Sequence, residues 1–398
     1  MQQRLRKERR VSKVEGQGSL RLMIAGGGTG GHVLPAVAVI EEIRRRGLDV
    51  EFVWIGSHAG VERSIAAANE IRFHAIQTGK LRRYISGKTV VDAFRIPIGT
   101  AQAWLHVRRF RPDVIYSTGG AVSVPSVVAG ARSTPILTHE QTAQIGIANR
   151  TSARFADVFA VTFDDTAELA RQIHKNVVVT GNPVRSSLTG GMAENAYARF
   201  GFTPDLPVLY VTGGARGANP INERLMPELP RLLQKMQIVH QVGPASANND
   251  AATLRQLRST WPDTLQRRYV VEEFIGAEIA DLYAITDLVL GRAGAGTITE
   301  LSFMGLPSIL MPLPGTWGDE QRKNARVLAN VNASVTLEQE DATPERLATE
   351  IEQLITNRER LDAMSAAART RSRPDAAARL VDELLKLAGR EGKRDPFL

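Results

Sequence analysis

The segment that decides the fold is RLMIAGGGTGGH, residues 21–32. Its apolar start is typical of a buried strand, and its glycines let the backbone approach a ligand closely. A strand, a glycine-rich turn and then a helix form the opening unit of an α/β sheet, and the helix N-terminus attracts anionic groups. We therefore predict a strand over Arg21–Ala25, a helix over Pro35–Arg46 and a second strand over Val50–Ile55.

Short apolar runs continue at the spacing of βαβ units, and the pattern then starts again after about the middle of the chain. In the second half, a strand again leads into a glycine-rich turn, GGARGA at residues 213–218. Two doubly wound α/β halves with parallel sheets are therefore expected, with ligands at the carboxyl ends of the strands and in the cleft between the halves. The further predicted strands are Val114–Ser117, Ile136–His139, Val158–Val161, Val177–Thr180, Val208–Thr212, Ile238–Gln241, Val270–Glu272, Leu288–Leu290 and Ser308–Met311.

Length and composition fit two globular domains. The chain has 398 residues, no cysteine and a formal net charge of +8, so disulfides and thiolate chemistry are excluded and an anionic partner is favoured. No apolar run reaches the roughly 18 residues of a membrane span, and the basic N-terminus lacks the apolar core of a secretory signal. We expect a basic arm at 1–19, domains at 20–186 and 187–370, and a C-terminal segment at 371–398 whose helix crosses back to the first half.

His32 is the first candidate for chemistry. It follows the first glycine turn at a helix start, where the helix dipole disfavours a charged imidazole, and a neutral imidazole suits a general base. A histidine satisfied by its own loop is an equally good interpretation at this stage. A dinucleotide-binding loop is disfavoured, because the glycine spacing differs from that motif and no acidic residue closes the second strand.

Other positions admit two interpretations each. Arg216 in the second glycine turn suits a phosphate, although a solvated arginine is the alternative. Glu300 can accept hydrogen bonds from a ribose, but Thr297-Ile298-Thr299-Glu300 is also the pattern of a helix capping box. The charged run Asp319–Asn324 is more typical of a solvated helix start, and Phe274-Ile275 of a core pair at a strand end.

Eight motifs in order then resemble one family. They are GGGTGGHVLPA (26–36), GKLRRY (79–84), RPDVIYSTGG (111–120), HEQTAQIGIANR (139–150), TGNPVR (180–185), GGARGA (213–218), RAGAGTITEL (292–301) and DEQRKNA (319–325). From about Leu20 to Ile355 the chain is similar to the MurG family. These are GT-B enzymes that transfer N-acetylglucosamine from UDP-GlcNAc to undecaprenyl-pyrophosphoryl-N-acetylmuramyl-peptide, converting lipid I to lipid II in peptidoglycan synthesis.

The resemblance implies a role for each matched position. His32 or Glu140 would be the catalytic base of an inverting transfer to the C4 hydroxyl of the acceptor, whose binding residues would be Thr29, Gly30, Thr142 and Asn149. No metal or other cofactor is expected, because helix dipoles neutralise the leaving UDP, and no nucleic acid partner is implied. The donor-binding residues would be Gly28, Arg185, Gly214, Ala215, Arg216, Ile275, Arg292, Ala295, Gly296, Thr297, Glu300, Glu320 and Gln321.

Four positions depart from the family pattern. Ala121 stands where an aromatic residue is usual, and Thr142 where Asn or Asp is usual. Both lie near the acceptor, so a related transferase with another lipid acceptor remains an alternative, as does a GT-B-like UDP-GlcNAc epimerase. Ala215 and Arg216 replace the usual Ser-Gln, so a cation is gained where a hydroxyl is lost.

The stretch Lys80–Leu105 mixes cations with large apolar residues. Such a mixture suits a surface that enters anionic headgroups, although a core helix with a solvated face shows the same pattern. Because the acceptor of the resembling family is lipid-linked, we expect peripheral attachment at the cytoplasmic face of the plasma membrane.

Overall fold

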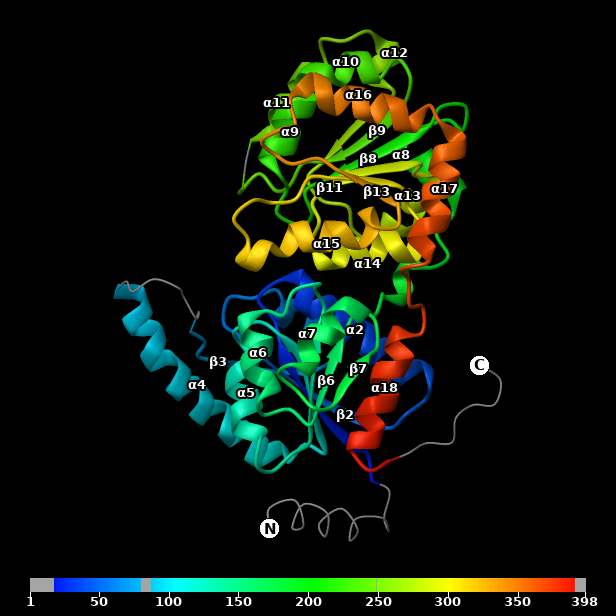
Figure 1. Cartoon of the computed structure of the whole chain (residues 1–398). Coiled ribbons are helices and arrows are strands. Elements are labelled where there is room, and N and C mark those ends of the chain that lie inside the picture. The colour runs from blue at the N-terminus through cyan, green and yellow to red at the C-terminus, as the bar shows by residue number, and fades with distance from the viewer. Residues whose placement is uncertain (1–17, 80–86, 248, 391–398) are drawn as a thin grey trace. The chain divides into compact units, whose positions relative to one another are not determined.

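The chain forms two compact units. The computed structural model describes residues 18–79, 87–247 and 249–390, so the predicted basic arm lies outside the described residues except for Gly18 and Ser19 (Figure 1). The first unit comprises the chain up to Gln141, Ile145–Pro183 and the segment from Asp375 onward, and the second comprises Thr142–Gln144 and Val184–Pro374. Among the described helices, none is both long enough and apolar enough to cross a bilayer.

The first unit contains a seven-stranded sheet in the order β3-β2-β1-β4-β5-β6-β7. Every neighbouring pair is parallel. Strand order reverses between β1 and β4, and a sheet of this kind binds ligands beside that point. The strands are β1 (Leu20–Gly26), β2 (Val50–Ser57), β3 (Arg72–Ile76), β4 (Val114–Gly119), β5 (Ile136–Glu140), β6 (Val158–Val161) and β7 (Val177–Val179).

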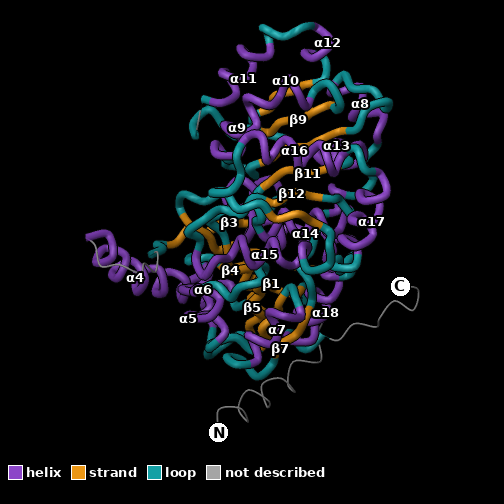
Figure 2. The backbone as a smooth tube through the Cα atoms, turned by 45° about the horizontal axis from the view of Figure 1, so that its top comes forward, coloured by secondary structure: helices purple, strands orange, loops and turns teal. Residues whose placement is uncertain are grey.

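Helices cover both faces of this sheet (Figure 2). Side chains of β1 alternate between the faces, as expected for a strand buried on both sides. Leu22 and Ile24 pack in a core with α2 and α18, whereas Met23 and Ala25 pack in another with α4 and α5. The helices of this unit are α2 (Gly30–Arg45), α3 (Glu62–Ala68), α4 (Gly87–Phe110), α5 (Ser123–Gly130), α6 (Ile147–Ala153), α7 (Asp164–Arg171) and α18 (Ala376–Leu387).

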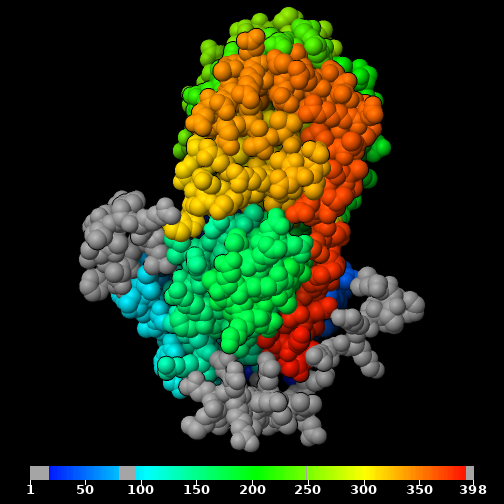
Figure 3. Space-filling view, in the orientation of Figure 1, coloured from blue at the N-terminus to red at the C-terminus, as the bar shows by residue number. Residues whose placement is uncertain are grey.

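The C-terminal helix α18 belongs to the first unit although it follows the second in sequence. Its apolar side, which includes Leu380 and Leu384, is buried in the core beside α2. An ion pair between Arg46 and Asp382, 2.6 Å apart, adds a polar contact at the edge. The space-filling view shows this helix in red on the surface of the first unit (Figure 3).

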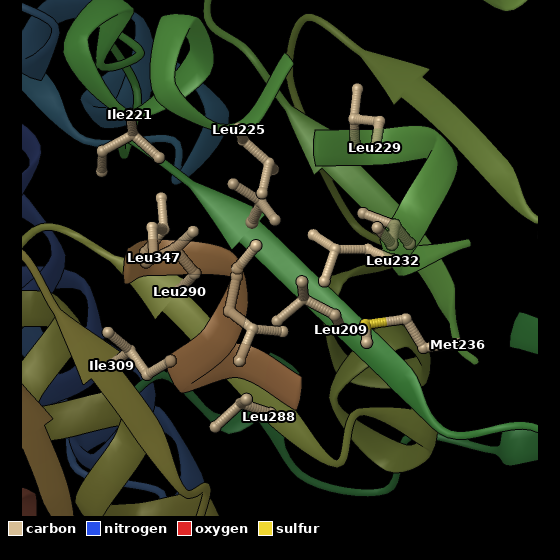
Figure 4. Packing of buried hydrophobic residues seen from close by; sticks show 14 of the residues in the cluster. Leu209, Ile221, Leu225, Leu229, Leu232, Met236, Leu288, Leu290, Ile309 and Leu347 are labelled. Carbon is tan, nitrogen blue, oxygen red and sulfur yellow. The ribbon is translucent and has the colours of Figure 1, made fainter. Parts of the chain in front are cut away.

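The second unit repeats the design with a six-stranded parallel sheet in the order β10-β9-β8-β11-β12-β13. Its order reverses between β8 and β11. Leu209 on β8 and Leu288 and Leu290 on β11 lie in the core beneath Leu225 and Leu347 (Figure 4). The strands are β8 (Val208–Thr212), β9 (Gln237–Gln241), β10 (Tyr269–Glu272), β11 (Leu288–Gly291), β12 (Ser308–Leu310) and β13 (Ser334–Thr336).

The helices of the second unit vary widely in length. The longer ones are α8 (Ala193–Phe200), α11 (Asp250–Arg258), α14 (Ala295–Met304), α15 (Glu320–Ala329), α16 (Pro344–Ile355) and α17 (Arg358–Arg369). The shorter ones are α9 (Asn219–Leu225), α10 (Leu229–Leu232), α12 (Asp263–Gln266) and α13 (Ile279–Ile285), and short 3₁₀ turns lie at Ser186–Leu188, Met226–Glu228 and Trp317–Asp319.

The predicted strands agree with the structure to within a residue or two, but two strands were not predicted. These are β3 and β13, which are short and carry polar residues. The predicted start of the first helix was wrong, because α2 begins at Gly30 and Pro35 lies inside it. Thr29 has the extended conformation of a cap residue, so the last two glycines form the first turn of the helix and bring His32 into it.

Candidate functional site

The first candidate site lies at the carboxyl ends of β1 and β4, where strand order reverses. Two glycine turns meet there. Gly120 has φ of +80°, and a Cβ on it would lie 2.6 Å from the carbonyl oxygen of Gly27 and 3.4 Å from Cδ2 of His32. A side chain at position 120 is therefore excluded by the close approach of the two turns, and the His32 ring is packed against this backbone.

A buried carboxylate, which the sequence analysis missed, holds the first turn. Glu62 is fully buried and accepts hydrogen bonds from the Gly28 N–H at 2.9 Å, the Ser57 N–H at 2.7 Å and the Ser57 hydroxyl at 2.6 Å. The amide of Gly28 is thus bonded within the protein and is not available to a phosphate. Since Glu62 lies 34 residues from Gly28, no local pattern indicated this contact.

His32 is held by one ring nitrogen. Its Nδ1 lies 3.1 Å from the carbonyl oxygen of Thr118 and 3.1 Å from the side-chain oxygen of Gln141. Both neighbours can only accept, so Nδ1 carries the proton and donates. In the neutral ring Nε2 then has a lone pair, and it makes no hydrogen bond to the described residues. A neutral imidazole with an unused lone pair meets the requirement for a general base.

Glu140, the other candidate base, is differently placed. It ends β5, is buried, and its Oε2 accepts from the Gly146 N–H at 2.9 Å and from the amide of Asn149 at 3.0 Å. Asn149 also donates to the His139 carbonyl at 3.1 Å, and its own buried Oδ1 has no partner among the described residues. Glu140 therefore holds Asn149, whereas His32 has a ring nitrogen with no described partner.

The remaining predicted acceptor residues lie on the turns. Thr29 is exposed at the start of α2, and its carbonyl accepts from the His32 N–H at 3.1 Å. Gly30 is the first residue of that helix, where backbone N–H groups lack helical partners. Thr142 is buried and its hydroxyl donates to the Gln144 carbonyl. The structure thus brings Thr29, Gly30 and His32 together on one short segment.

The second candidate site lies at the carboxyl ends of β8 and β11. Here the glycine turn is open in that Ala215 and Arg216, between Gly214 and Gly217 of positive φ, are exposed. The Gly214 N–H donates to the Thr212 hydroxyl at 3.0 Å. The Arg216 guanidinium makes no hydrogen bond or ion pair with the described residues. Arg185 has a buried Nε with no described partner, so two cations in this unit have donors available for an anion.

Glu300 is fixed by side chains from other elements. It accepts from the Tyr283 hydroxyl at 2.8 Å, and its other oxygen lies 4.0 Å from Arg185. Burial raises the pKa of Glu300, while the Tyr283 hydrogen bond and the charge of Arg185 act in the opposite direction. The capping-box interpretation was wrong, because α14 is capped by Gly294 and Thr297 lies inside the helix.

The N-terminus of α14 presents small residues. Ala295 is buried, Gly296 has open space where a Cβ would lie, and Thr297 is half-buried. Arg292 before it is buried and donates to the carbonyls of Met311 at 2.9 Å and Pro312 at 3.2 Å and to Gln339 at 2.7 Å. Burial lowers the pKa of Arg292 to about 10. Arg292 therefore links the loop before α14 to the segments after β12 and β13 by hydrogen bonds.

Phe274 and Ile275 follow the last residues of β10. The core-pair interpretation was right for Ile275, which is 5% exposed, and wrong for Phe274, which is 60% exposed. The backbone N–H and C=O of Ile275 make no hydrogen bond within the described part of the chain. A planar base with a complementary donor and acceptor can therefore bond to this backbone.

The segment Asp319–Asn324 is more than a solvated helix start. Gln321 accepts from the backbone N–H groups of Leu313 at 2.9 Å and Ala293 at 3.2 Å, and the fully buried Asn324 donates to the Ala293 carbonyl at 3.1 Å. Glu320 is the first residue of α15. These contacts join α15 to the loop before α14, so Gln321 and Glu320 lie in the same unit as Glu300 and Arg185.

Helix α4 of the first unit carries an exposed apolar surface. Ile98, Trp104 and Leu105 are 51%, 47% and 41% exposed, and the guanidinium of Arg108 lies 4.7 Å from the centre of the Trp104 ring. On the opposite side of the helix, Ala103 and Val107 are buried in the core. Residues 80–86 of the predicted membrane patch lie outside the described residues.

Family models match parts of both units. Residues 22–161 match the glycosyltransferase family 28 N-terminal domain, and residues 208–380 match the glycosyltransferase family 28 C-terminal domain. In Bacillus thuringiensis, a relative named UDP-N-acetylglucosamine–N-acetylmuramyl-(pentapeptide) pyrophosphoryl-undecaprenol N-acetylglucosamine transferase 3 is 36% identical, with 85% of this chain and 92% of the relative aligned. The transferase of the same name (without a number) in Listeria welshimeri is 34% identical, with 92% of this chain and 99% of the relative aligned.

Among solved structures, the crystal structure of Acinetobacter baumannii MurG superposes with a TM-score of 0.70 at 27% identity, covering 92% of this chain and 99% of that one. The predicted two-domain GT-B fold and the resemblance stated from the motifs are confirmed by these matches together with the two parallel sheets.

Proposed function

Since the chain belongs to the family of UDP-N-acetylglucosamine–N-acetylmuramyl-(pentapeptide) pyrophosphoryl-undecaprenol N-acetylglucosamine transferases, we propose that it catalyses the transfer which that name describes. The donor is UDP-GlcNAc and the acceptor is lipid I, so the product is lipid II. The observation that carries this proposal from the chain's own geometry is His32, whose Nδ1 donates to two oxygens and whose Nε2 lone pair has no described partner.

In the proposed reaction, the C4 hydroxyl of the N-acetylmuramyl unit gives its proton to Nε2 of His32. Its oxygen forms a bond to the anomeric carbon of GlcNAc while the bond from that carbon to the UDP oxygen breaks. Attack opposite the leaving group inverts the anomeric configuration. Glu140 and Asn149 support the acceptor side as a buried pair rather than as the base.

The second unit holds the donor. The backbone of Ile275 receives the uracil ring and Glu300 accepts from the ribose hydroxyls. Glu320 and Gln321 face the sugar. The diphosphate contacts Arg185, Arg216 and the N-terminus of α14, where backbone N–H groups and the helix dipole favour negative charge.

We further propose that UDP departs without help from a metal ion, because these cations and the helix N-terminus stabilise the developing charge. The measurement is turnover with and without EDTA, with magnesium added back. A loss of turnover in EDTA that magnesium restores would contradict this part of the proposal.

The deciding experiment uses the purified full-length protein and radiolabelled UDP-GlcNAc. We expect label in the lipid product with a lipid I analogue and none with diacylglycerol, the acceptor left open by Ala121 and Thr142. UDP-GlcNAc alone should remain unchanged, because epimerisation needs additional acid and base groups around the sugar. Transfer to diacylglycerol, or a new sugar nucleotide without acceptor, would overturn the assignment.

We propose that the protein attaches peripherally to the cytoplasmic leaflet through α4. Support comes from the exposed Ile98, Trp104 and Leu105 and from cations such as Arg108 on the same helix, since each cation near an anionic surface adds about 1 kcal/mol of attraction. The basic residues Lys80, Arg82 and Arg83 and the N-terminal arm would add to this attraction.

Liposome co-sedimentation tests the attachment with a matched pair of variants. Leu105 on α4 and Leu169 on α7 are equally exposed, at 41%. Binding should require anionic lipid, weaken with salt and fall for Leu105→Ser, whereas Leu169→Ser should bind like the unchanged protein. Equal loss in both variants, or recovery in the supernatant under all conditions, would refute attachment through α4.

A further inference from the structure

A connected set of hydrogen bonds runs behind His32 through two fully buried polar side chains. His139, at the end of β5, is 0% exposed, and Gln141, two residues further, is 1% exposed. Buried polar groups that all have partners specify one arrangement of protons, because the alternatives leave donors facing donors or acceptors facing acceptors. The protons in this set can therefore be assigned from the heavy atoms alone.

The first assignment is that of His139. Its Nε2 lies 3.0 Å from the carbonyl oxygen of Gly181, which can only accept, so Nε2 carries a proton. Burial lowers the pKa of His139 to about 4, so the ring is neutral at physiological pH. Its Nδ1 is consequently an acceptor, 3.3 Å from the amide nitrogen of Gln141.

The second assignment is the orientation of Gln141. Its amide nitrogen faces three acceptors, which are the Thr118 carbonyl at 2.9 Å, the His139 carbonyl at 3.0 Å and Nδ1 of His139. The reversed amide would place its oxygen against all three, which is excluded. The amide oxygen must therefore point to His32, where it lies 3.1 Å from Nδ1.

These assignments converge on one ring nitrogen. We propose that Gln141, itself oriented by His139, is a positioning residue that keeps the proton of neutral His32 on Nδ1 and so leaves the Nε2 lone pair for the acceptor hydroxyl. The inference rests on the proposed function, in which His32 is the base. The carbonyl of Thr118 also accepts from His32, but it is shared with Gln141, and two acceptors fix the ring plane better than one.

Contacts on the opposite side of the His32 ring support the same orientation. Cδ2 of His32, the carbon bonded to Nε2, lies 3.4 Å from the position that a Cβ on Gly120 would take. The ring is thus held between the glycine turn and the two acceptors. Without the Gln141 oxygen, only the Thr118 carbonyl accepts from Nδ1, so the preference for a proton on Nδ1 is weaker. In the other tautomer Nε2 carries the proton and has no lone pair.

The test measures the tautomer directly by nitrogen NMR of the full-length protein labelled at its seven histidines. The His32 signals are assigned by their loss in His32→Gln. In the unchanged protein we expect a protonated Nδ1 and an unprotonated Nε2. Gln141→Met, which removes the polar atoms and keeps the length, should give a mixture of tautomers. It should also lower kcat about 2- to 13-fold, the effect of one neutral hydrogen bond, with an unchanged KM for UDP-GlcNAc.

Two further variants separate positioning from a merely structural role. Gln237→Met removes an equally buried glutamine from the second unit, so it should lower the melting temperature while leaving the His32 signals and kcat unchanged. Gln141→Asn keeps an amide but shortens the side chain by one methylene, so its oxygen withdraws from Nδ1 of His32 and a mixture of tautomers should again appear. If Gln141→Met fails to fold, an unchanged tautomer in Gln141→Asn would overturn the proposal.

The outcomes are distinct. An unchanged His32 tautomer in Gln141→Met would overturn the proposal, and so would a changed tautomer with full kcat. If His32→Gln itself remains active, the assigned base is wrong, and Gln141 then has no catalytic role even where the NMR result agrees. A changed tautomer, a lower kcat and an inactive His32→Gln together support it.

Discussion

Both units have a glycine-rich turn at the same position of their sheets, but the side chains around the two turns differ. In both, the turn follows the strand at which the order of the sheet reverses, β1 in the first unit and β8 in the second. In the first unit, Glu62 accepts a hydrogen bond from the Gly28 N–H, and the next helix carries His32. In the second, the turn is open and exposes Arg216.

This difference separates two chemical tasks. In the first turn the Gly28 amide is bonded to the protein's own carboxylate, and the helix that follows carries a histidine with one ring nitrogen held by two acceptors. The second unit has two cations with available donors, Arg185 and Arg216, and the N-terminus of α14 follows β11, the strand beside β8, which suits a diphosphate. Topology therefore determines where each site lies, whereas a few side chains determine whether it holds a proton acceptor or an anion.

Replacing His32 should have the largest effect on turnover. A small effect would contradict the assignment of the base to the first unit. His32→Ala should lower kcat about 10²- to 10⁴-fold, the contribution typical of a general base, because the proposed reaction uses the Nε2 lone pair of His32 as the proton acceptor. Affinity for UDP, measured by calorimetry, should not change, since the donor residues lie in the other unit. Near-normal turnover would move the base to Glu140 or to another group.

Replacing Glu300 should have the next largest effect, confined to the donor. Glu300→Gln keeps the size of the side chain and a partner for Tyr283 but removes the charged acceptor, which is worth about 1.5–3 kcal/mol, or roughly 10- to 150-fold in the dissociation constant of UDP. Because burial raises the pKa of this carboxyl, the ionised form is costly to bury, and the melting temperature at neutral pH should not fall. Unchanged UDP affinity would remove Glu300 from the ribose site.

The raised pKa of Glu300 also predicts a pH dependence of UDP binding. A carboxylate that accepts from two hydroxyls must be ionised, so UDP affinity should be complete above the folded-state pKa and decline as the pH falls through it. That decline should begin above the ordinary range of a glutamate, because burial raises the pKa. The check is the ratio of UDP dissociation constants for the unchanged protein and Glu300→Gln across pH, in which the titration of UDP itself cancels. A constant ratio would contradict it.

Most strands and several site residues could be predicted from the sequence. The polar strands and the helix starts could not, because local patterns do not determine them. Buried strands such as β8 are apolar runs bounded by proline or glycine, and they were located almost to the residue. By contrast, β3 carries Arg72 and His74 and has no such run. Local patterns also misled: Thr297 and Glu300 have capping-box spacing, but the helix had already begun at Ala295.

The side chains that orient the sites were missed because their contacts span long stretches of chain. Glu62 meets Gly28, Gln141 meets His32, and Tyr283 meets Glu300 only once the sheets have formed. A single sequence gives residue types and spacing along the chain but not these pairings. Motifs could therefore indicate His32 and Glu300, whereas the groups that set their protonation required the structure.

The smallest expected effect tests whether the open turn of the second unit is an anion site in its own right. Arg216 is exposed, so its contact with a diphosphate is screened by water and salt. Arg216→Gln should weaken UDP binding about 2- to 5-fold at low salt and less at high salt. Arg360→Gln on α17 removes an equally exposed cation and should leave binding unchanged.

The compensation between Arg216 and its neighbour sharpens this test. If the cation replaces a hydroxyl lost at Ala215, then Ala215→Ser should improve UDP binding more in the Arg216→Gln background than in the unchanged protein, because only one of the two groups is needed at the diphosphate. Calorimetry on the four combinations gives the interaction free energy between the two positions. Independent, additive changes would show that the two positions do not substitute for each other, and the open turn would then bind UDP through its backbone and Arg185 alone.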